Sequence, residues 1–555
     1  MRRHFSYLSP HQSRLYSYFL TFLNAYRLNI ILLVLALLCF FGLYEIYPRP
    51  GWVDSGMYLG YAINPEIYKV YPFAAHNYQG SRLGYILPQY FILRIFGETN
   101  GREIYVLILY LAYFFSVMTL IGFFIKKNVE RTLLSVLFIF NPVFISSIFY
   151  GYADGPAAVQ LLAAISFLVC ASKSISPFIR NGFYFFSGFL LILSISSHIF
   201  ALIPALLIVP AFLYLLKVTK PTVTIIFGGL SAMFICNYYG YQFGLDRFYF
   251  LYSLPFAKIA LFSGIGRIFA DPFTVQVKNF LLWLPVILSI LFFFILNRNL
   301  STLQGKQFPL LVVSLLNLIG PVVIFTLFDV FTGGNTLVTP FRFSIVYPSF
   351  LVGLVLMFSL DIETTGKNDV INISKTYQTR TALVFLVCVS LILTFSASYT
   401  RSLFSWNSVK SIDLYRSEVS FMERFRSYGI NARKNQIIYT AIGPVGEGDP
   451  RVHKHYYGGS RQYFDYMDSL TSLFLWDRST AARLKPNTDF KKVSLKLNKD
   501  IPIIILGRSK AEVRKLVIQL SRFLIRYTAG PYECFDDNSY PWCFIEFKNM
   551  GRIDV

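Results

Sequence analysis

Long apolar segments recur in this sequence from residue 30 to residue 399, and they limit what the chain can fold into more than any other feature. A helix of about 20 apolar residues is long enough to cross the hydrocarbon core of a bilayer. The sequence therefore predicts an α-helical polytopic membrane protein. The stretch 83–97 is shorter and is expected to lie partly embedded or at the membrane interface. We expect eleven spans, at residues 30–47, 104–125, 132–150, 156–172, 182–197, 199–216, 222–240, 279–297, 308–328, 340–360 and 382–399.

The composition supports a membrane protein, and the charge distribution suggests its orientation. With 55% hydrophobic and 14% charged residues, the chain is too apolar for a soluble globular protein. Its net charge of +22 comes from Lys and Arg residues scattered between the apolar segments and through the C-terminal part, which favours membrane topology over a nucleic-acid partner. Residues 1–29 contain basic residues and no acid, so we expect this N-terminal segment to be cytoplasmic.

The C-terminal part, residues 400–555, is expected on the opposite, extracytoplasmic side. An odd number of spans places it there, and every loop then predicted to be cytoplasmic carries basic residues. The assignment depends on a chain reversal at the sequence SISSH, residues 194–198. A single continuous helix at that point would place the C-terminal part in the cytoplasm.

Residues 400–555 have the composition of a soluble domain. Strand-like segments such as QIIYTAIG and IPIIILG alternate with helix-like ones such as SKAEVRKLVIQLSRFLIRY, which predicts a small mixed α/β domain. Cys534 and Cys543 lie close together in the polar sequence ECFDDNSYPWC. In an oxidising compartment they would suit a disulfide that closes a hairpin, and the absence of a neighbouring His or Cys disfavours a metal site.

The segment 48–102, which follows the first predicted span, is expected to be an outer loop and contains the first candidate functional residues. Asp54 stands close to the expected membrane surface, and a carboxylate costs about 2.5–3.5 kcal/mol at the centre of a membrane helix, so such an acid is either solvated or functional. Aromatic residues, among them Tyr58 and Tyr61, follow it, and Arg82 precedes the short apolar stretch 83–97. An aromatic belt at the interface explains the rings but not the acid and the guanidinium.

A second acid, Asp154, lies in the sequence YGYADGP after the third predicted span. On its own it has a structural explanation, because an acid in the first turn of a helix interacts favourably with the helix dipole and Pro is common there. The predicted topology nevertheless assigns Asp54 and Asp154 to the same face of the membrane. Two such acids together indicate a functional site at that face.

These motifs and their order resemble the GT-C superfamily of integral-membrane glycosyltransferases, especially the branch with protein O-mannosyltransferases and the bacterial aminoarabinose transferases of lipid A, that is, glycosyltransferase family 39. In that family an acid follows the first span, and a second acid precedes a small residue and Pro at the start of the fourth. Asp54 in WVDSGMYLGYA and Asp154 in YADGPAA match these positions. Arg82 in GSRLGYILP matches the basic residue that contacts the donor's lipid phosphate.

The resemblance extends over about residues 25–360. Arg342 and Tyr347 in PFRFSIVYPSF match a later Arg-aromatic stretch that ends in Tyr-Pro. The sequence departs from the family at two points: SRLGY replaces the usual Pro-Pro pair, and a second acid beside Asp54 is absent.

The resemblance implies a glycosyltransferase that moves a sugar from a polyprenyl-phosphate donor to an acceptor at the outer face of the bacterial cytoplasmic membrane, by a single inverting displacement. Asp54 is expected to act as the base and Arg82 to bind the donor phosphate, because transfer needs a proton acceptor and positive charge for the departing phosphate. Asp154 would orient the acceptor or a basic partner, or help to hold a divalent cation such as Mg²⁺ or Mn²⁺. Two acids so far apart in the sequence do not establish a metal site.

The remaining candidates have both functional and structural interpretations. Arg342 could bind phosphate, pair with Asp329 or extend to the interface, whereas Tyr347 is expected either to line the substrate site, as Tyr58 and Tyr61 are, or to serve in packing. His198 at the SISSH break is interpreted as a loop or interface residue, and a direct role in the site is the less favoured alternative.

Two other classes of protein remain open. A transporter or flippase of lipid-linked saccharides would be expected to show charges along the bilayer midplane and repeated halves. The sequence shows no such repeat, and its acids lie near one surface. A non-catalytic membrane scaffold with an extracytoplasmic interaction domain is the third interpretation. The sequence identifies neither the sugar nor the acceptor.

Overall fold

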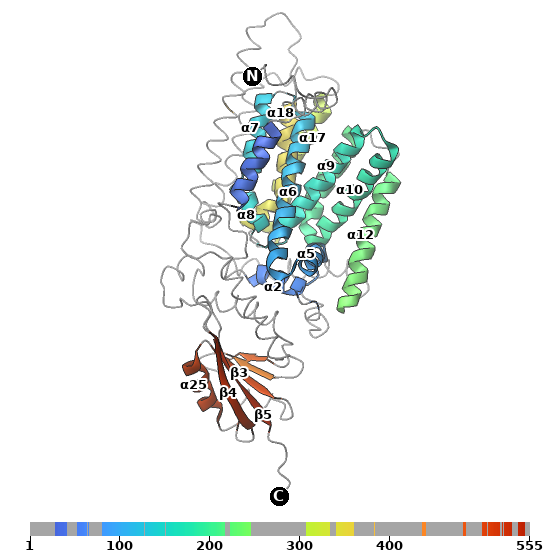
Figure 1. The fold of residues 1–555 in the computed structure, drawn as a ribbon. Coiled ribbons are helices and arrows are strands. Elements are labelled where there is room, and N and C mark those ends of the chain that lie inside the picture. Colours follow the sequence, from blue (N-terminus) through green and yellow to red (C-terminus); the bar gives the residue numbers. More distant parts are fainter. Residues whose placement is uncertain are drawn as a thin grey trace, which may run out of the picture.

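The computed structural model describes residues 28–41, 53–63, 65, 80–126, 128–149, 151–216, 222–245, 307–332, 340–359, 382, 436–439, 481–483, 502–507, 509–521, 524, 527–535 and 542–549. These residues form a helical bundle and a separate C-terminal sheet (Figure 1). In the bundle the helices are Leu28–Phe41, α2 (Val53–Ile63), α5 (Leu83–Phe96), α6 (Glu98–Phe124), α7 (Asn128–Ile139), α8 (Pro142–Phe149), α9 (Asp154–Lys173), α10 (Pro177–Ser197), η1 (Ile199–Ala201), α11 (Leu202–Leu215), α12 (Thr222–Phe243), α17 (Gln307–Thr332) and α18 (Pro340–Ser359).

Several of these helices are long and apolar enough to cross a membrane. Within the described residues there are five, at Asn100–Phe124, Asp154–Lys173, Pro177–Ser197, Thr222–Phe243 and Phe308–Leu327, and shorter apolar helices accompany them. The span Asp154–Lys173 is 83% buried inside the protein, compared with 28% for Pro177–Ser197 and for Thr222–Phe243. Helix α9 is therefore central, and the chain is a multi-pass membrane protein. The spans expected at 279–297 and, except for residue 382, at 382–399 lie outside the described residues.

The prediction of one continuous span at residues 132–150 was wrong. The segment is divided into α7 and α8, which end and begin on either side of Phe140 and Asn141. Asn141 caps α8: its side-chain oxygen accepts a hydrogen bond from the Phe144 N–H (3.2 Å), and Pro142 occupies the first position of the helix, where proline is favoured. The apolar composition of the whole segment concealed this local stop signal.

The segment 48–102, which we expected to be an outer loop, contains two helices in its described part. Helix α2 begins one residue before Asp54, and α5 occupies the stretch predicted as a short embedded helix. Helix α5 ends at Gly97, whose φ of 81° lies in the left-handed region that glycine adopts without steric cost. Helix α6 follows immediately, so it begins earlier than the predicted span 104–125.

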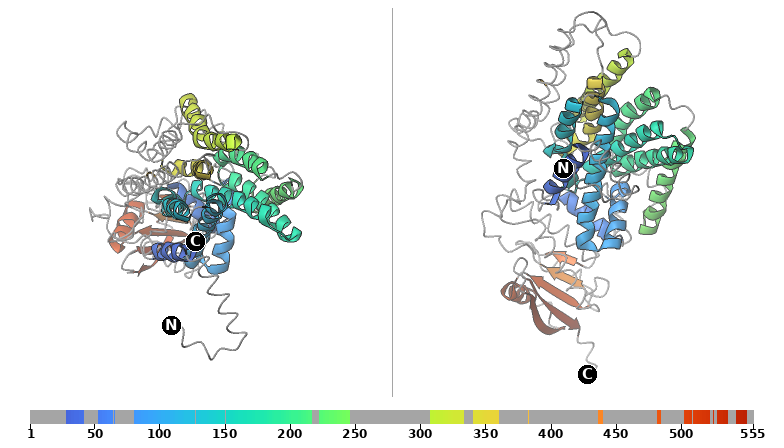
Figure 2. Two further views of the ribbon diagram at one scale, coloured as in Figure 1. Left: turned by 90° about the horizontal axis from the view of Figure 1, so that it is seen from above. Right: turned by 45° about the horizontal axis from the view of Figure 1, so that its top comes forward.

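The chain reverses at His198. The C-terminal ends of α10 and α12 both contact the first turn of α5: Ser196 Oγ accepts a hydrogen bond from the Gly84 N–H (3.0 Å), and a methyl group added at Gly240 would lie 3.0 Å from Leu83. Helices α10 and α12 also lie side by side in two views (Figures 1 and 2). Because both helices end at the same end of the bundle, α11, which connects them in sequence, runs in the opposite direction. The break at SISSH is therefore a true reversal.

The C-terminal part forms a five-stranded mixed sheet in the order β2-β1-β3-β5-β4. Its elements are β1 (Gln436–Tyr439), β2 (Ala481–Arg483), β3 (Ile503–Gly507), α25 (Lys510–Leu520), β4 (Tyr527–Phe535) and β5 (Trp542–Asn549). Strands β1, β2 and β3 pair in parallel, whereas β3, β5 and β4 pair antiparallel. Helix α25 covers the sheet through Val513, Leu516 and Leu520.

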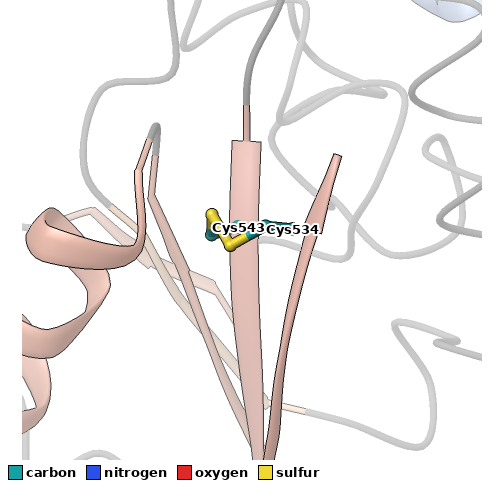
Figure 3. Close-up of a disulfide and its surroundings, with 2 residues drawn as sticks. All are labelled: Cys534 and Cys543. Atoms are coloured by element: carbon teal, nitrogen blue, oxygen red, sulfur yellow. A yellow bond between two sulfur atoms is a disulfide. The ribbon is translucent and has the colours of Figure 1, made fainter. Parts of the chain in front are cut away.

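A disulfide joins Cys534 of β4 to Cys543 of β5, which face each other in the antiparallel register (Figure 3). The sheet lies beyond the end of the helical bundle that carries α2 and α5, and two views agree on this placement (Figures 1 and 2). Residues at that end of the bundle and the sheet therefore lie on the same side of the membrane-spanning region.

Candidate active site

Arg82 is a buried cation at the sheet-facing end of the bundle. It immediately precedes α5 and is 5% exposed, and its guanidinium carbon lies 5.2 Å from the centre of the Tyr58 ring. A guanidinium over an aromatic face is a favourable cation–π contact. The Tyr58 ring also packs edge-on against Tyr85 at 5.4 Å. These contacts hold α2 against the first turn of α5.

Asp54 lies at the same end of the bundle. Its backbone is in the first turn of α2, four residues before Tyr58, and positions four apart share one face of a helix. Its side chain lies outside the described part of the structure. Tyr61, also on α2, is 2% exposed. Asp54 therefore belongs to the helix whose Tyr58 ring packs against Arg82.

Asp154 is the first residue of α9 and is 1% exposed. The start of α9 packs closely against α8. A methyl group added at Gly155 would lie only 2.3 Å from the carbonyl oxygen of Ser147, so the contact leaves no room for a side chain. The preceding turn contains Gly151 with a φ of 75°, in the left-handed region. The hydroxyl of Tyr85 donates a hydrogen bond to the Gly151 carbonyl (3.0 Å), which ties this turn to α5.

His198 contacts Asp154. Its Nε2 atom lies 3.5 Å from Oδ1 of Asp154, and the side chains of His198 and Asp154 are 0% and 2% exposed. Its Nδ1 atom accepts a hydrogen bond from the Phe200 N–H (3.2 Å). An imidazole nitrogen that accepts a hydrogen bond carries no proton, so in the neutral ring the proton is on Nε2 and faces the acid.

A network of polar groups joins α5, α9 and α10 behind these residues. Gln160 of α9 donates to the Gly84 carbonyl (3.0 Å) and accepts from the Ser197 hydroxyl (2.7 Å). Gly84 needs to be glycine, because a Cβ atom there would lie 2.2 Å from the carbonyl oxygen of Leu193. The turn that follows Arg82 is therefore fixed to the two helices that carry Asp154 and His198.

Arg102, on α6, is a second buried guanidinium, 1% exposed. It donates to the Tyr85 hydroxyl (3.4 Å) and to the carbonyl oxygen of Phe149 at the end of α8 (3.3 Å). Neither Arg102 nor the contact of His198 with Asp154 was predicted from the sequence. One signal was present for Arg102, because a basic residue at the predicted outer end of a span departs from the positive-inside rule. Contact between His198 and Asp154 has no such signal.

The other predicted site residues are placed differently. Tyr347 of α18 is buried away from Arg82 in the helix packing: its hydroxyl lies 3.1 Å from that of Tyr113, and both hydroxyls donate to the carbonyl oxygen of Phe138 near the end of α7. Its ring stacks on Phe144 at 4.3 Å. The side chain of Arg342 lies outside the described part of the structure. Among the described residues, no three His, Cys, Asp or Glu side chains are grouped to hold a metal ion.

The fold and the site together define a helical, multi-pass membrane protein with a small C-terminal sheet and a cluster of buried charged groups at one end of the bundle. No protein-family model matches the sequence, and no curated protein is significantly similar to it. Among solved structures the chain is similar to ArnT from Cupriavidus metallidurans in the apo state, with a TM-score of 0.42 and 10% identity over 93% of this chain and 97% of that chain. The same protein bound to undecaprenyl phosphate matches with a TM-score of 0.43, 10% identity and the same coverage.

Proposed function

We propose that the protein is a membrane glycosyltransferase that moves a sugar from a polyprenyl-phosphate donor to an acceptor at the membrane surface. The observation that carries this proposal is the convergence of Arg82, Asp154 and the Asp54-bearing helix α2 at one end of the bundle. Arg82 and Asp154 are separated in the sequence by helices α5 to α8, yet they lie at the same end of the bundle. A cation for a phosphate and acids for an acceptor hydroxyl are the groups that such a transfer requires.

Arg82 is proposed to bind the donor phosphate. A guanidinium can hold two phosphate oxygens at once, and its positive charge stabilises the phosphate as it leaves the sugar. Burial to 5% exposure strengthens this interaction, because nearby water screens it less. Arg342 is proposed as a second phosphate ligand on the basis of the motif PFRFSIVYPSF.

Asp54 is proposed as the base. The acceptor hydroxyl oxygen attacks the anomeric carbon while the bond from that carbon to the phosphate oxygen breaks, with inversion. The proton of the hydroxyl passes to the Asp54 carboxylate, and polyprenyl phosphate leaves with the bonding electron pair. Asp154 orients the acceptor, and Tyr58 and Tyr61 border the site from α2. A divalent cation, Mg²⁺ or Mn²⁺, remains compatible with the two acids but has no step assigned to it.

The proposed site faces the extracytoplasmic side of a bacterial cytoplasmic membrane. The basic N-terminal segment and basic loops favour this orientation. The C-terminal sheet lies beyond the same end of the bundle, and its disulfide between Cys534 and Cys543 suits an oxidising compartment. The acceptor would then be an envelope component: lipid, glycan or protein.

A flippase of lipid-linked saccharides is the alternative. It would be expected to place charges along a path at mid-bilayer, whereas Arg82, Arg102 and the Asp154–His198 pair all lie at one end of the described bundle.

A lipid-resolved comparison of membranes with and without the protein tests the proposal. Mass spectrometry of extracted lipids and glycans should show the loss of one sugar modification and accumulation of its polyprenyl-phosphate donor when the protein is missing. Restoration by the wild-type protein but not by the Arg82→Ala variant would support phosphate binding at Arg82. An unchanged set of modified lipids, glycans and proteins would contradict the proposal.

A further inference from the structure

Asp154 and His198 form a buried pair of ionisable groups. They come from different helical segments, the first turn of α9 and the reversal after α10, and their side chains are 2% and 0% exposed. Burying either group costs free energy unless the environment supplies hydrogen bonds or opposite charge. Such a pair at the end of a membrane bundle points to a function.

The two nitrogens of His198 have separate roles. Nδ1 accepts from the Phe200 N–H at 3.2 Å and caps the short helix η1, which fixes the ring within the reversal. Nε2 consequently carries the proton of the neutral ring and faces Asp154 at 3.5 Å. This separation exceeds the usual 2.7–3.2 Å of a hydrogen bond, and catalytic contacts are often long before substrate binds.

We propose that His198 is a positioning residue for sugar transfer: its Nε2–H holds the Asp154 carboxylate in the orientation that faces the acceptor. This inference rests on the proposed transferase function. A donor beside a carboxylate fixes the direction in which its oxygens point, so the contact with Nε2 can hold the Asp154 side chain in the orientation that the acceptor requires. His198 contacts Asp154 through Nε2 and the backbone of η1 through Nδ1, and its proposed role is exercised through the acid.

Two substitutions separate this role from the structural role of the histidine. In His198→Asn the side-chain amide takes the place of Nδ1, so it can still accept from the Phe200 N–H but cannot reach Asp154. In His198→Gln the terminal amide takes the place of Nε2, so it can still donate to Asp154 but loses the cap. The two variants therefore preserve opposite contacts of the same side chain.

The experiment is steady-state transfer by the purified full-length protein in lipid nanodiscs, with the labelled donor and acceptor identified from the membrane comparison. We expect His198→Asn to lower kcat on the order of 100-fold at an unchanged unfolding temperature, and His198→Gln to keep kcat within about tenfold of wild type. Adding His198→Asn to Asp154→Asn should cause little further loss, because the two residues act as a unit.

Wild-type kcat in His198→Asn would overturn the positioning role while leaving the transferase intact. So would an equal loss in both variants with a lowered unfolding temperature, which would mark the histidine as structural alone. A wild-type protein that transfers no sugar would overturn both this inference and the proposed function.

Discussion

The hydroxyl of Tyr85 donates to the carbonyl oxygen of Gly151 across 3.0 Å, and this one bond connects the helix that follows Arg82 to the turn that precedes Asp154. The same hydroxyl accepts from Arg102 at 3.4 Å. The buried Tyr85 therefore links the segment that contains Arg82, the proposed phosphate-binding residue, to the turn before Asp154, one of the proposed acids. The positions of these two groups depend on each other through the packing of α5 against the turn at Gly151.

Replacing Tyr85 by Phe should test this relationship. The ring can remain in place, but the Gly151 carbonyl and the Arg102 guanidinium each lose a buried partner, at a cost of about 1–3 kcal/mol. We expect a lower unfolding temperature in detergent together with slower transfer. Tyr90→Phe is the matched control, because the Tyr90 ring packs edge-on against Phe243 and sits on the same helix; it should behave as wild type. Equal behaviour of the two variants would argue against a role of the Tyr85 hydroxyl.

The close contact between α8 and α9 gives a second prediction. In Gly155→Ala the new methyl group would lie 2.3 Å from the Ser147 carbonyl oxygen, so the helices must separate, at a cost of about 1–3 kcal/mol or more. Gly182→Ala in α10 is the control, because nothing lies within 4 Å of its methyl group. We expect size-exclusion profiles and unfolding temperatures to show a destabilised Gly155→Ala protein and an unchanged or slightly stabilised Gly182→Ala protein. A Gly155→Ala protein as stable as wild type would refute the tight contact.

Replacing Tyr347 by Phe tests whether this residue serves in helix packing or lines the substrate site. Its hydroxyl contacts Tyr113 and the Phe138 carbonyl at the break between α7 and α8, so Tyr347→Phe should destabilise the protein by about 1–2 kcal/mol. Because these contacts lie in the helix packing, the KM for the donor should stay within about threefold of wild type, a change of well under 1 kcal/mol in binding. Calorimetry and donor titration measure the two effects. A large rise in KM with unchanged stability would instead place Tyr347 in the substrate site.

The sequence predicted the features that depend on local composition. Apolar segments of sufficient length identified α6, α9, α10, α12 and α17 because burial in lipid requires them. The Asn141-Pro142 pair is a local signal for the break between α7 and α8. The apolar residues on both sides of the pair nevertheless favoured the prediction of one continuous span. The contact between His198 and Asp154 was not predictable in this way, because it arises only when two separate helix ends meet. Motif order singled out Arg82 and Asp154 as candidates, whereas the contacts of Arg102 with Tyr85 and Phe149 are visible only in the packed structure.

The disulfide tests the compartment of the C-terminal sheet. In a variant with Cys39, Cys170, Cys236 and Cys388 replaced by Ser or Ala, the two remaining cysteines should resist a maleimide–polyethylene glycol reagent until the denatured protein is reduced. A variant whose only cysteine is Cys236 should react with the same reagent in the denatured protein without reduction, because Cys236 is a free thiol. Closing a loop with a sequence separation of 9 should also contribute about 2.5 kcal/mol to stability. Free thiols at both positions in protein taken directly from cells would contradict an oxidising location.

The most direct test of the account is the fate of the phosphosugar bond in proteoliposomes that contain a labelled polyprenyl-phosphate sugar and the acceptor. The wild-type protein should break that bond and transfer the label to the acceptor. The Asp54→Asn variant, inserted and folded as the wild type, should leave the bond intact and transfer at least about 100-fold more slowly, because it lacks the base. Label that crosses the membrane with its phosphosugar bond unbroken, or full transfer by Asp54→Asn, would contradict the account.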